Sequence, residues 1–278
     1  MWDRGYPMQS LAGTFAPLPT PFTDDGGQIS EIRLARVIRW ALERGAQGFL
    51  VNSSAGEFTC TGSDERKNLL EWALREVKSR VPIVANATSL NTGSSLDLAQ
   101  HAGRHGARAA VVAVPYFGSF TQRELYQHYK LIAQYADLPI WVLDPGGMIQ
   151  EETWSELLAL PSMSRCQPLS GGHYPSVEGG LGLEEFSCGE VGISPMVTLF
   201  GPDPSPAIVP YLDAWAEAFR LLGSARLTKA VFQNVGIDLG TTRAPLLPLE
   251  YDAGDLIRRL CAETWPSKEG AAGQSPAA

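Results

Sequence analysis

The stretch Ala109-Ala110-Val111-Val112-Ala113-Val114 is six apolar residues with no polar residue between them. A continuous apolar run of this kind is typical of a strand buried on both faces in a parallel sheet. Similar strand-like runs occupy residues 14–17, 48–52, 82–87 and 139–144. Stretches with helical spacing of their apolar residues lie between these runs, at 30–44, 64–79, 94–105, 122–136 and 151–160.

Uninterrupted strand–helix repeats favour an α/β fold with right-handed crossovers between parallel strands. Eight such units in roughly 250 residues form a (β/α)8 TIM barrel, which is the fold that we predict. A doubly wound sheet is the competing architecture, but no G-x-G-x-x-G motif follows a strand. We expect one barrel domain at residues 13–265, an N-terminal extension at 1–12 and a flexible polar tail at 266–278. Ser30, Ser63 and Thr121 are expected to cap three of the helices.

The charge balance is acidic, with 22 Lys and Arg residues against 30 Asp and Glu residues and a formal net charge of -8. Without a block of Lys and Arg, the chain lacks the electrostatic footprint of a protein that binds nucleic acid or an anionic membrane. No apolar run approaches the ~20 residues of a membrane span, and residues 1–10 lack the apolar core of a secretory signal. The four cysteines form no C-x-x-C pair, so we expect reduced thiols and a cytoplasmic protein.

Four segments, in order, resemble the dihydrodipicolinate synthase / N-acetylneuraminate lyase family of TIM-barrel aldolases. Residues 14–22 (TFAPLPTPF) resemble the family's first strand, and Ser54-Ala55-Gly56-Glu57 resembles its G-[ST]-T-G-E loop. Residues 114–117 (VPYF) with 124–129 (ELYQHY) resemble its fourth strand and helix, and 243–249 (RAPLLPL) its C-terminal helical region. The resemblance covers about residues 13–263.

The resemblance implies a mechanism in which a lysine at the end of the sixth strand forms a Schiff base with a 2-oxo acid such as pyruvate. Such a lysine must be desolvated, so that its amine is partly neutral. A tyrosine ending the fifth strand moves protons, an arginine just after it binds a second carboxylate, and the G-T-T-G-E loop holds the first. The resemblance also implies a small carbonyl substrate and a homodimer or homotetramer. We expect neither a cofactor nor a metal.

This sequence departs from the family where that chemistry lies. Leu143 falls at the tyrosine position, Met148 near the arginine and Gln167 at the lysine. A second alignment places 169–171 on the seventh strand and deletes the lysine strand. Both alignments lose the lysine, because the chain's five lysines are Lys67, Lys78, Lys130, Lys229 and Lys268. We therefore expect no Schiff-base activity.

A length deficit accompanies the loss. Two crossovers should connect the sixth strand to the eighth, yet only residues 163–195 are available, which is 33 residues. One βαβ unit alone takes roughly 30 or more. We predict a degenerate barrel that is short by about a helix or one βα unit between residues 163 and 195.

Polar residues predicted at the carboxyl ends of the strands are the candidates for a site. Tyr116, Asp144, His173 and Gln167 are the candidate catalytic residues. Asn52, Ser53, Ser54, Asn86 and Ser194 are the candidate substrate-binding residues. The competing structural interpretations are a rim turn for the serines, a self-capping turn for Asp144 and a solvent-exposed loop for His173.

Other titratable residues are assigned structural or surface roles. Glu57 is expected to be largely structural, and no spacing of it with Asp144 and His173 supports a metal site. His101, His105 and His128 lie on helical patterns and are expected at the surface.

Two functional classes remain. The first is a repurposed lyase- or synthase-type enzyme that uses acid–base groups on a carbonyl or carboxylate substrate. The second is a non-catalytic homologue that binds a ligand or a partner subunit. An enclosed cavity on which Asp144, His173 or Tyr116 converge favours the enzyme, whereas an apolar pocket with these groups scattered favours binding.

Overall fold

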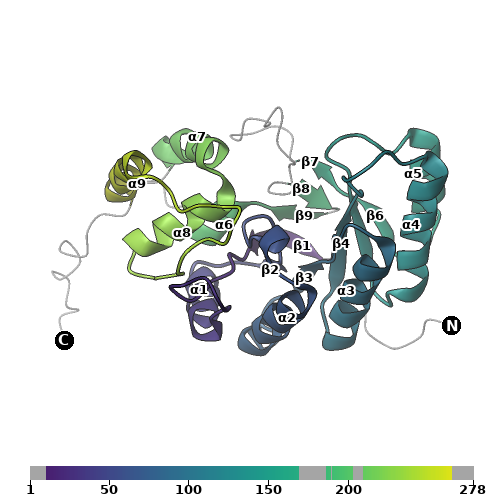
Figure 1. Ribbon diagram of the computed structural model, residues 1–278, viewed down its shortest axis with the longest axis horizontal. Helices are drawn as coiled ribbons and strands as arrows, with labels where there is room; N and C mark the ends of the chain where they lie inside the picture. Colours follow the sequence, from purple (N-terminus) through teal and green to yellow (C-terminus); the bar gives the residue numbers. More distant parts are fainter. Residues whose placement is uncertain (1–10, 169–185, 189, 203–208, 265–278) are drawn as a thin grey trace, which may run out of the picture.

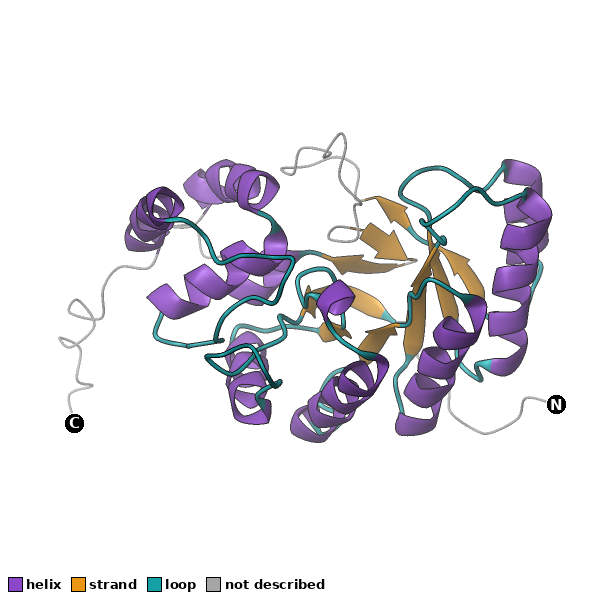
Figure 2. Ribbon diagram, in the orientation of Figure 1, coloured by secondary structure: helices purple, strands orange, loops and turns teal. Residues whose placement is uncertain are grey.

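The structure is a computed structural model that describes residues 11–168, 186–188, 190–202 and 209–264. Helices surround a curled sheet (Figures 1 and 2). The strands are β1 (Ala12–Pro17), β2 (Gly48–Val51), β3 (Ile83–Asn86), β4 (Ala109–Ala113), β5 (Ile140–Leu143), β6 (Met163–Arg165), β7 (Gln167–Pro168), β8 (Phe186–Cys188) and β9 (Glu190–Ile193). The helices are α1 (Glu31–Glu43), α2 (Ser63–Val77), α3 (Thr92–His105), α4 (Gln122–Tyr135), α5 (Glu151–Leu158), α6 (Pro195–Phe200), α7 (Leu212–Leu222), α8 (Ser224–Asn234) and α9 (Tyr251–Thr264). Two 3₁₀ turns, Phe58–Cys60 and Val209–Tyr211, complete the set.

The first five strands each lead into a helix, as the apolar runs predict. Strands β1 to β6 pair with their neighbours in parallel, and β9 pairs in parallel with β1. The predicted strand–helix order and parallel sheet are therefore confirmed for this part of the chain.

The strand order in the sheet is β6-β5-β4-β3-β2-β1-β9-β8-β7. The strands at its two ends, β6 and β7, are consecutive in the chain. Only Cys166 separates β6 from β7, and its N–H donates to the Val142 carbonyl at 2.8 Å. The segment 163–168 thus pairs first with β5 and then with β8, which closes the sheet. Strand β8 runs antiparallel to both β7 and β9, a departure from an all-parallel barrel.

Closure creates two apolar layers. Residues that face outward from the strands pack against the helices in a large cluster that includes Phe49, Val112 and Trp154. A second cluster includes Phe15, Trp141 and Leu143 and fills the space inside the sheet. The interior of the barrel is therefore a packed core rather than a channel, as is usual for this architecture.

The degenerate-barrel prediction falls partly on residues 169–185 and 189, which lie outside the described residues. Within the described part of 163–195, the structure has the short strands β6 to β9, and the next helix is α6. The predicted extension and tail also lie largely outside the described residues. No helix in the described ranges is long and apolar enough to cross a membrane.

Three sequence predictions need correction. Ser63 is the first residue of α2 and not its cap; Gly62 is the cap, and its N–H donates to the Glu65 carboxylate at 3.0 Å. His101 and His128 are buried, with exposed fractions of 8% and 6%, because α3 packs on both α2 and α4. The caps at Ser30 and Thr121 are confirmed.

Candidate functional site

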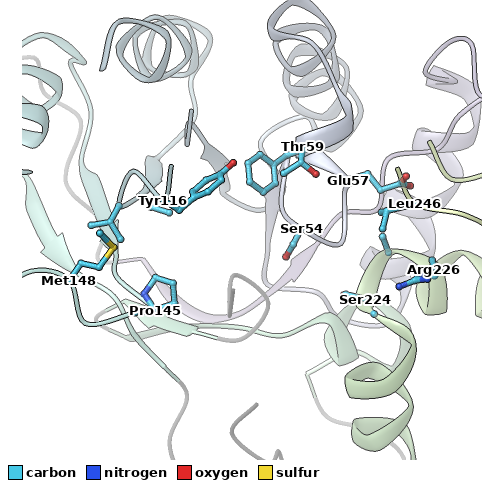
Figure 3. A pocket seen from close by; sticks show the side chains of 15 residues that line it. Ser54, Glu57, Thr59, Tyr116, Pro145, Met148, Ser224, Arg226 and Leu246 are labelled. Carbon is cyan, nitrogen blue, oxygen red and sulfur yellow. The ribbon is translucent and has the colours of Figure 1, made fainter. Parts of the chain in front are cut away.

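A pocket of about 290 Å³ lies at the carboxyl ends of β2, β4 and β5 (Figure 3). Its walls come from the loop after β2, the segments that follow β4 and β5, and the first turn of α8. The lining residues are Ser54, Glu57, Phe58, Thr59, Ala113, Val114, Tyr116, Pro145, Gly146, Met148, Gly223, Ser224, Ala225, Arg226 and Leu246. This edge of the sheet is where the active sites of TIM barrels lie.

Most of the pocket wall is apolar, and a few polar groups are set into it. The hydroxyls of Ser54 and Ser224 are buried and have no hydrogen-bond partner among the described residues. The Arg226 guanidinium forms no hydrogen bond or ion pair within the same ranges. Buried polar groups in proteins are normally satisfied, so unpaired hydroxyls beside an unpaired cation indicate a place for a polar ligand.

The first turn of α8 adds a further attraction for anions. Gly223 caps the helix without a side-chain hydrogen bond, and Gly223, Ser224 and Ala225 all line the pocket. The first N–H groups of a helix lack partners within the helix and carry its partial positive charge. The pocket therefore combines a helix N-terminus with Arg226 and two hydroxyls.

The loop after β2 is held in place by hydrogen bonds and close packing. Ser53 Oγ accepts a hydrogen bond from the Gly56 N–H at 3.2 Å, and Thr20 Oγ1 donates to the Gly56 carbonyl at 2.5 Å. A Cβ at Gly56 would lie 2.8 Å from the Leu18 carbonyl, so only glycine fits there. Of the two candidate serines, Ser53 stabilises the turn and Ser54 lines the pocket.

Asn52 and Asn86 hold neighbouring strand ends together beneath this loop. Asn52 Nδ2 donates to the Arg66 carbonyl at 3.0 Å, and Asn86 Nδ2 donates to the Asn52 carbonyl at 2.8 Å. The Arg66 guanidinium donates to the carbonyls of Thr88 and Asn86 at 2.8 and 2.6 Å. Burial lowers the pKa of Arg66 to about 10. Neither asparagine lines the pocket.

Asp144 turns its carboxylate into its own loop. Its Oδ1 accepts from the Met148 N–H at 2.9 Å, and its Oδ2 accepts from the Ile149 N–H at 2.8 Å. Asp144 does not line the pocket, although its neighbours Pro145 and Gly146 do. These contacts match the self-capping turn that was the structural alternative for Asp144.

The remaining candidates are scattered. Tyr116 lines the pocket, and its ring packs edge-on against Phe117 with centroids 5.8 Å apart. Gln167 is exposed on β7, next to Cys166, which packs inside the barrel. Ser194 is buried at the end of β9, and its N–H donates to the Phe15 carbonyl at 3.5 Å. His173 lies outside the described residues.

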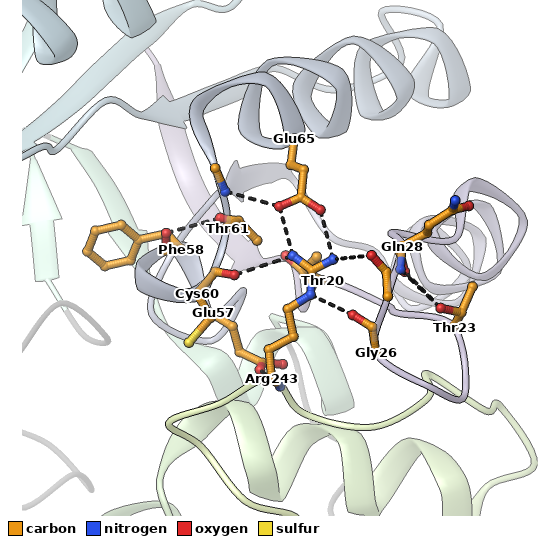
Figure 4. A network of polar contacts seen from close by, with 12 residues as sticks. Thr20, Thr23, Gly26, Gln28, Glu57, Phe58, Cys60, Thr61, Glu65 and Arg243 are labelled. Carbon is orange, nitrogen blue, oxygen red and sulfur yellow. Dashed lines mark hydrogen bonds and ion pairs between the residues drawn. The ribbon is translucent and has the colours of Figure 1, made fainter.

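Glu57 ties the pocket loop to the C-terminal part of the chain (Figure 4). Its carboxylate lies 2.5 Å from Lys229 Nζ and accepts from the Arg243 N–H at 2.9 Å. Arg243 in turn pairs with Glu65 at 2.7 Å and donates to the Gly26 carbonyl at 2.7 Å. This network supports the structural role expected for Glu57.

Sequence reasoning missed Ser224 and Arg226 at the pocket and Lys229 behind it. No motif marks them, because α8 meets the loop after β2 only in the folded chain. The close run of Ser224, Arg226 and Lys229 at the start of one amphipathic helix was the signal available.

Comparison with known proteins finds similarity to dihydrodipicolinate synthases. A model of the dihydrodipicolinate synthetase family matches residues 10–164. A 4-hydroxy-tetrahydrodipicolinate synthase of Bradyrhizobium diazoefficiens is 38% identical over 46% of this chain and 43% of its own length. One of Afipia carboxidovorans is 34% identical over 55% of this chain and 52% of its own length. The chain thus spans about half the length of these two curated relatives, whereas a synthase of Bacillus velezensis matches at 26% identity over 84% of this chain and 92% of its own length.

Solved structures show the same fold. A dihydrodipicolinate synthase of Thermotoga maritima superposes with a TM-score of 0.74 at 23% identity, covering 91% of this chain and 98% of that one. One of Agrobacterium tumefaciens gives 0.73 at 18% identity, covering 91% and 98%. The family match ends at residue 164, just before the segment in which the parallel order of the sheet breaks down. Because that match covers more than half of the 278 residues, the chain belongs to the dihydrodipicolinate synthetase family.

Proposed function

We propose that this chain binds a small carboxylic acid, of the 2-oxo acid or related carbonyl class, without forming a covalent bond to it. The observation that carries the proposal is the pocket at the start of α8, where Arg226 and the Ser54 and Ser224 hydroxyls lack partners among the described residues. Carboxylates are bound in proteins by donors of these kinds, a guanidinium, hydroxyls and the N–H groups of a helix N-terminus.

The dimensions and walls of the pocket suit such a ligand. At about 290 Å³ it is close to the lower limit of the range for small-molecule sites, roughly 300–1,000 Å³. Phe58, Val114 and Met148 offer apolar surface to the carbon skeleton. An apolar body with one charged end matches a short organic acid better than a sugar or a nucleotide.

The lysines support non-covalent binding. Lys67, Lys78, Lys130 and Lys229 are described, and none of them lines the pocket. Lys229 alone of these four is buried, and burial lowers its pKa, which would favour a neutral amine. Its Nζ, however, lies against Glu57 and donates to the Thr241 carbonyl at 2.6 Å, so the ammonium form is held in place.

Isothermal titration with pyruvate and longer 2-oxo acids tests the proposal. We expect one molecule of acid to bind per chain, and Arg226→Gln to weaken binding about tenfold or more, since a charge-assisted hydrogen bond contributes about 1.5–3 kcal/mol. Arg36→Gln is the matched control: Arg36 is exposed on α1, and the change in net charge is the same. Equal affinities of both variants would contradict the proposed site.

A second candidate function is a lyase- or synthase-type step by acid–base chemistry. Tyr116 favours it, because its phenol borders the pocket at the end of β4 and could exchange a proton with a bound carbonyl compound. Asp144 does not join it at the pocket. If turnover of any 2-oxo acid is found, Tyr116→Phe should lower kcat with little change in KM; an unchanged kcat would exclude this role.

We also propose that the barrel is a shortened form of the family's barrel and that the chain forms a homodimer or homotetramer. The direct passage from β6 to β7 supports the first idea, because 163–168 serves both β5 and β8. The exposed Phe117 ring, 78% accessible, supports the second. Light scattering on Phe117→Ser would show a reduced mass if this face is an interface.

A further inference from the structure

A cluster of two histidines and a glutamate lies between α2 and α3, away from the pocket. Glu71 Oε1 is 3.1 Å from His101 Nε2 and 3.6 Å from His105 Nε2, and the three ligand atoms all lie within 4.8 Å of one another. His101 and His105 are one helical turn apart on α3, and their rings stack with centroids 4.0 Å apart. From these residues we propose a binding site for a divalent transition-metal ion, with zinc as the ion that fits best.

The two glutamate–histidine separations are close to those of a metal site. Zinc holds imidazole nitrogen at about 2.0–2.1 Å in a tetrahedral arrangement, which places neighbouring ligand atoms roughly 3.3 Å apart. The two measured glutamate–histidine separations lie on either side of this value. Three protein ligands leave the fourth position to water, and imidazole with carboxylate is a ligand set that suits zinc.

The histidines are prepared to act as ligands. His105 Nδ1 lies 2.9 Å from the His101 carbonyl, which can only accept, so Nδ1 carries the proton and the lone pair is on Nε2. This contact to a backbone carbonyl is the kind of outer contact that orients metal-binding histidines. His101 Nε2 is buried and lies 3.1 Å from the Glu71 carboxylate, so this nitrogen points to the proposed site.

The surrounding charges are mixed. Lys67 and Arg104 lie near enough to disfavour a cation at this site. Lys67, however, is paired with Asp97 at 2.6 Å, and this pair also joins α2 to α3, one helical turn from Glu71 and His101. A bound metal ion would replace the two close glutamate–histidine contacts by coordination bonds. It would also join α2 to α3 near the end of α3, where the chain turns back toward the start of β4 and the edge of the sheet opposite the pocket.

The sequence alone did not suggest this site. A His-x-x-x-His spacing on a helical pattern is equally typical of two surface histidines that bind nothing. Glu71 lies beside them only because α2 and α3 pack side by side. The metal proposal is independent of the pocket and of its ligand, so either can fail without the other.

Calorimetric titration of the untagged, chelator-treated full chain with zinc chloride tests the site. We expect one zinc ion per chain, and His105→Ala and Glu71→Gln to weaken binding at least about tenfold, since even outer-shell changes cost about 10–100-fold. Both side chains are partly exposed, 39% and 41%, so these variants should fold, which circular dichroism checks. Glu76→Gln, with the same charge change on the same helix, should bind zinc as the wild type does.

Two further readouts make the result decisive. Cobalt in place of zinc should give visible d–d absorption without a thiolate charge-transfer band, and zinc should raise the Tm of the wild type but not that of His105→Ala. Absence of one-to-one binding in the wild type would overturn the proposal. So would unchanged affinity in both ligand variants, or a thiolate band, which would place the ion at a cysteine instead.

Discussion

Lys229 Nζ lies 2.5 Å from Glu57 Oε1, joining α8 to the loop after β2 across 172 positions of the chain. Both side chains are almost fully buried, and the ammonium also lies 4.3 Å from the centroid of the Phe22 ring. This pair holds α8 against the loop that carries Ser54. The pocket therefore depends on it for its shape.

We predict that Lys229→Met destabilises the protein by about 3–5 kcal/mol, because it leaves the Glu57 carboxylate buried without a cation. Glu57→Gln/Lys229→Met should cost clearly less than the sum of the two single changes, since the double variant buries no unpaired charge. Urea denaturation of the four proteins measures the coupling. Additive effects would show that the ion pair is not the connection.

The Asp144 carboxylate caps two N–H groups, so Asp144→Ala should lower the free energy of unfolding by about 1–2 kcal/mol. Asp144→Asn should lose less, because its amide oxygen can still accept one of the two hydrogen bonds. Acid binding in the pocket should be unaffected by either change. A loss of binding in Asp144→Asn at unchanged stability would assign Asp144 to the site instead of the turn.

Removal of the Ser54 hydroxyl should affect stability and acid binding in opposite directions. Ser54→Ala should leave stability unchanged or raise it by about 1 kcal/mol, because it removes a buried group without a partner among the described residues. The same change should weaken binding of the acid. Thr20→Val is the matched control: its hydroxyl is bonded to the Gly56 carbonyl, so its removal should cost about 1 kcal/mol of stability. A destabilised Ser54→Ala would indicate an intramolecular partner.

Stability should fall on acidification through His128. Burial lowers the pKa of His128 from 6.5 to about 4, so the folded protein binds fewer protons than the unfolded chain between these values. The stabilising contribution is complete above pH 6.5 and is lost as the pH falls toward 4, by about 3 kcal/mol at most. His128→Gln should flatten this part of the curve of unfolding free energy against pH. A wild-type curve that is already flat there would contradict the burial of a neutral ring.

Features that depend on a local residue pattern could be predicted from the sequence, whereas features that depend on contacts between distant segments could not. The run at 109–114 marks β4 because burial on both faces needs no knowledge of the partners, and the same holds for the other strands through β5. Serine has the chemistry of a cap, so the sequence predicts one at Ser63. The helix begins at Ser63 itself, and the Glu65 side chain accepts from the Gly62 N–H instead. His101 was expected at the surface because its helix pattern does not reveal that α2 covers it.

The same distinction holds for the residues that line the pocket. Ser54 and Tyr116 were found because they follow strands, and strand ends meet at one edge of a barrel. Ser224 and Arg226 come from a helix whose position over that edge is set by tertiary packing of α8 with α6, α7 and α9. Asp144 satisfied the positional rule but turned inward, because its own loop offers two N–H groups within reach.

Borohydride reduction in the presence of pyruvate tests the central claim most directly. The full chain and a lysine-bearing synthase of the family are treated in parallel and weighed by intact mass spectrometry. We predict an adduct on the synthase and none on this chain, under conditions in which calorimetry shows that the acid is bound. An adduct on any lysine of this chain, Lys229 included, would contradict non-covalent binding.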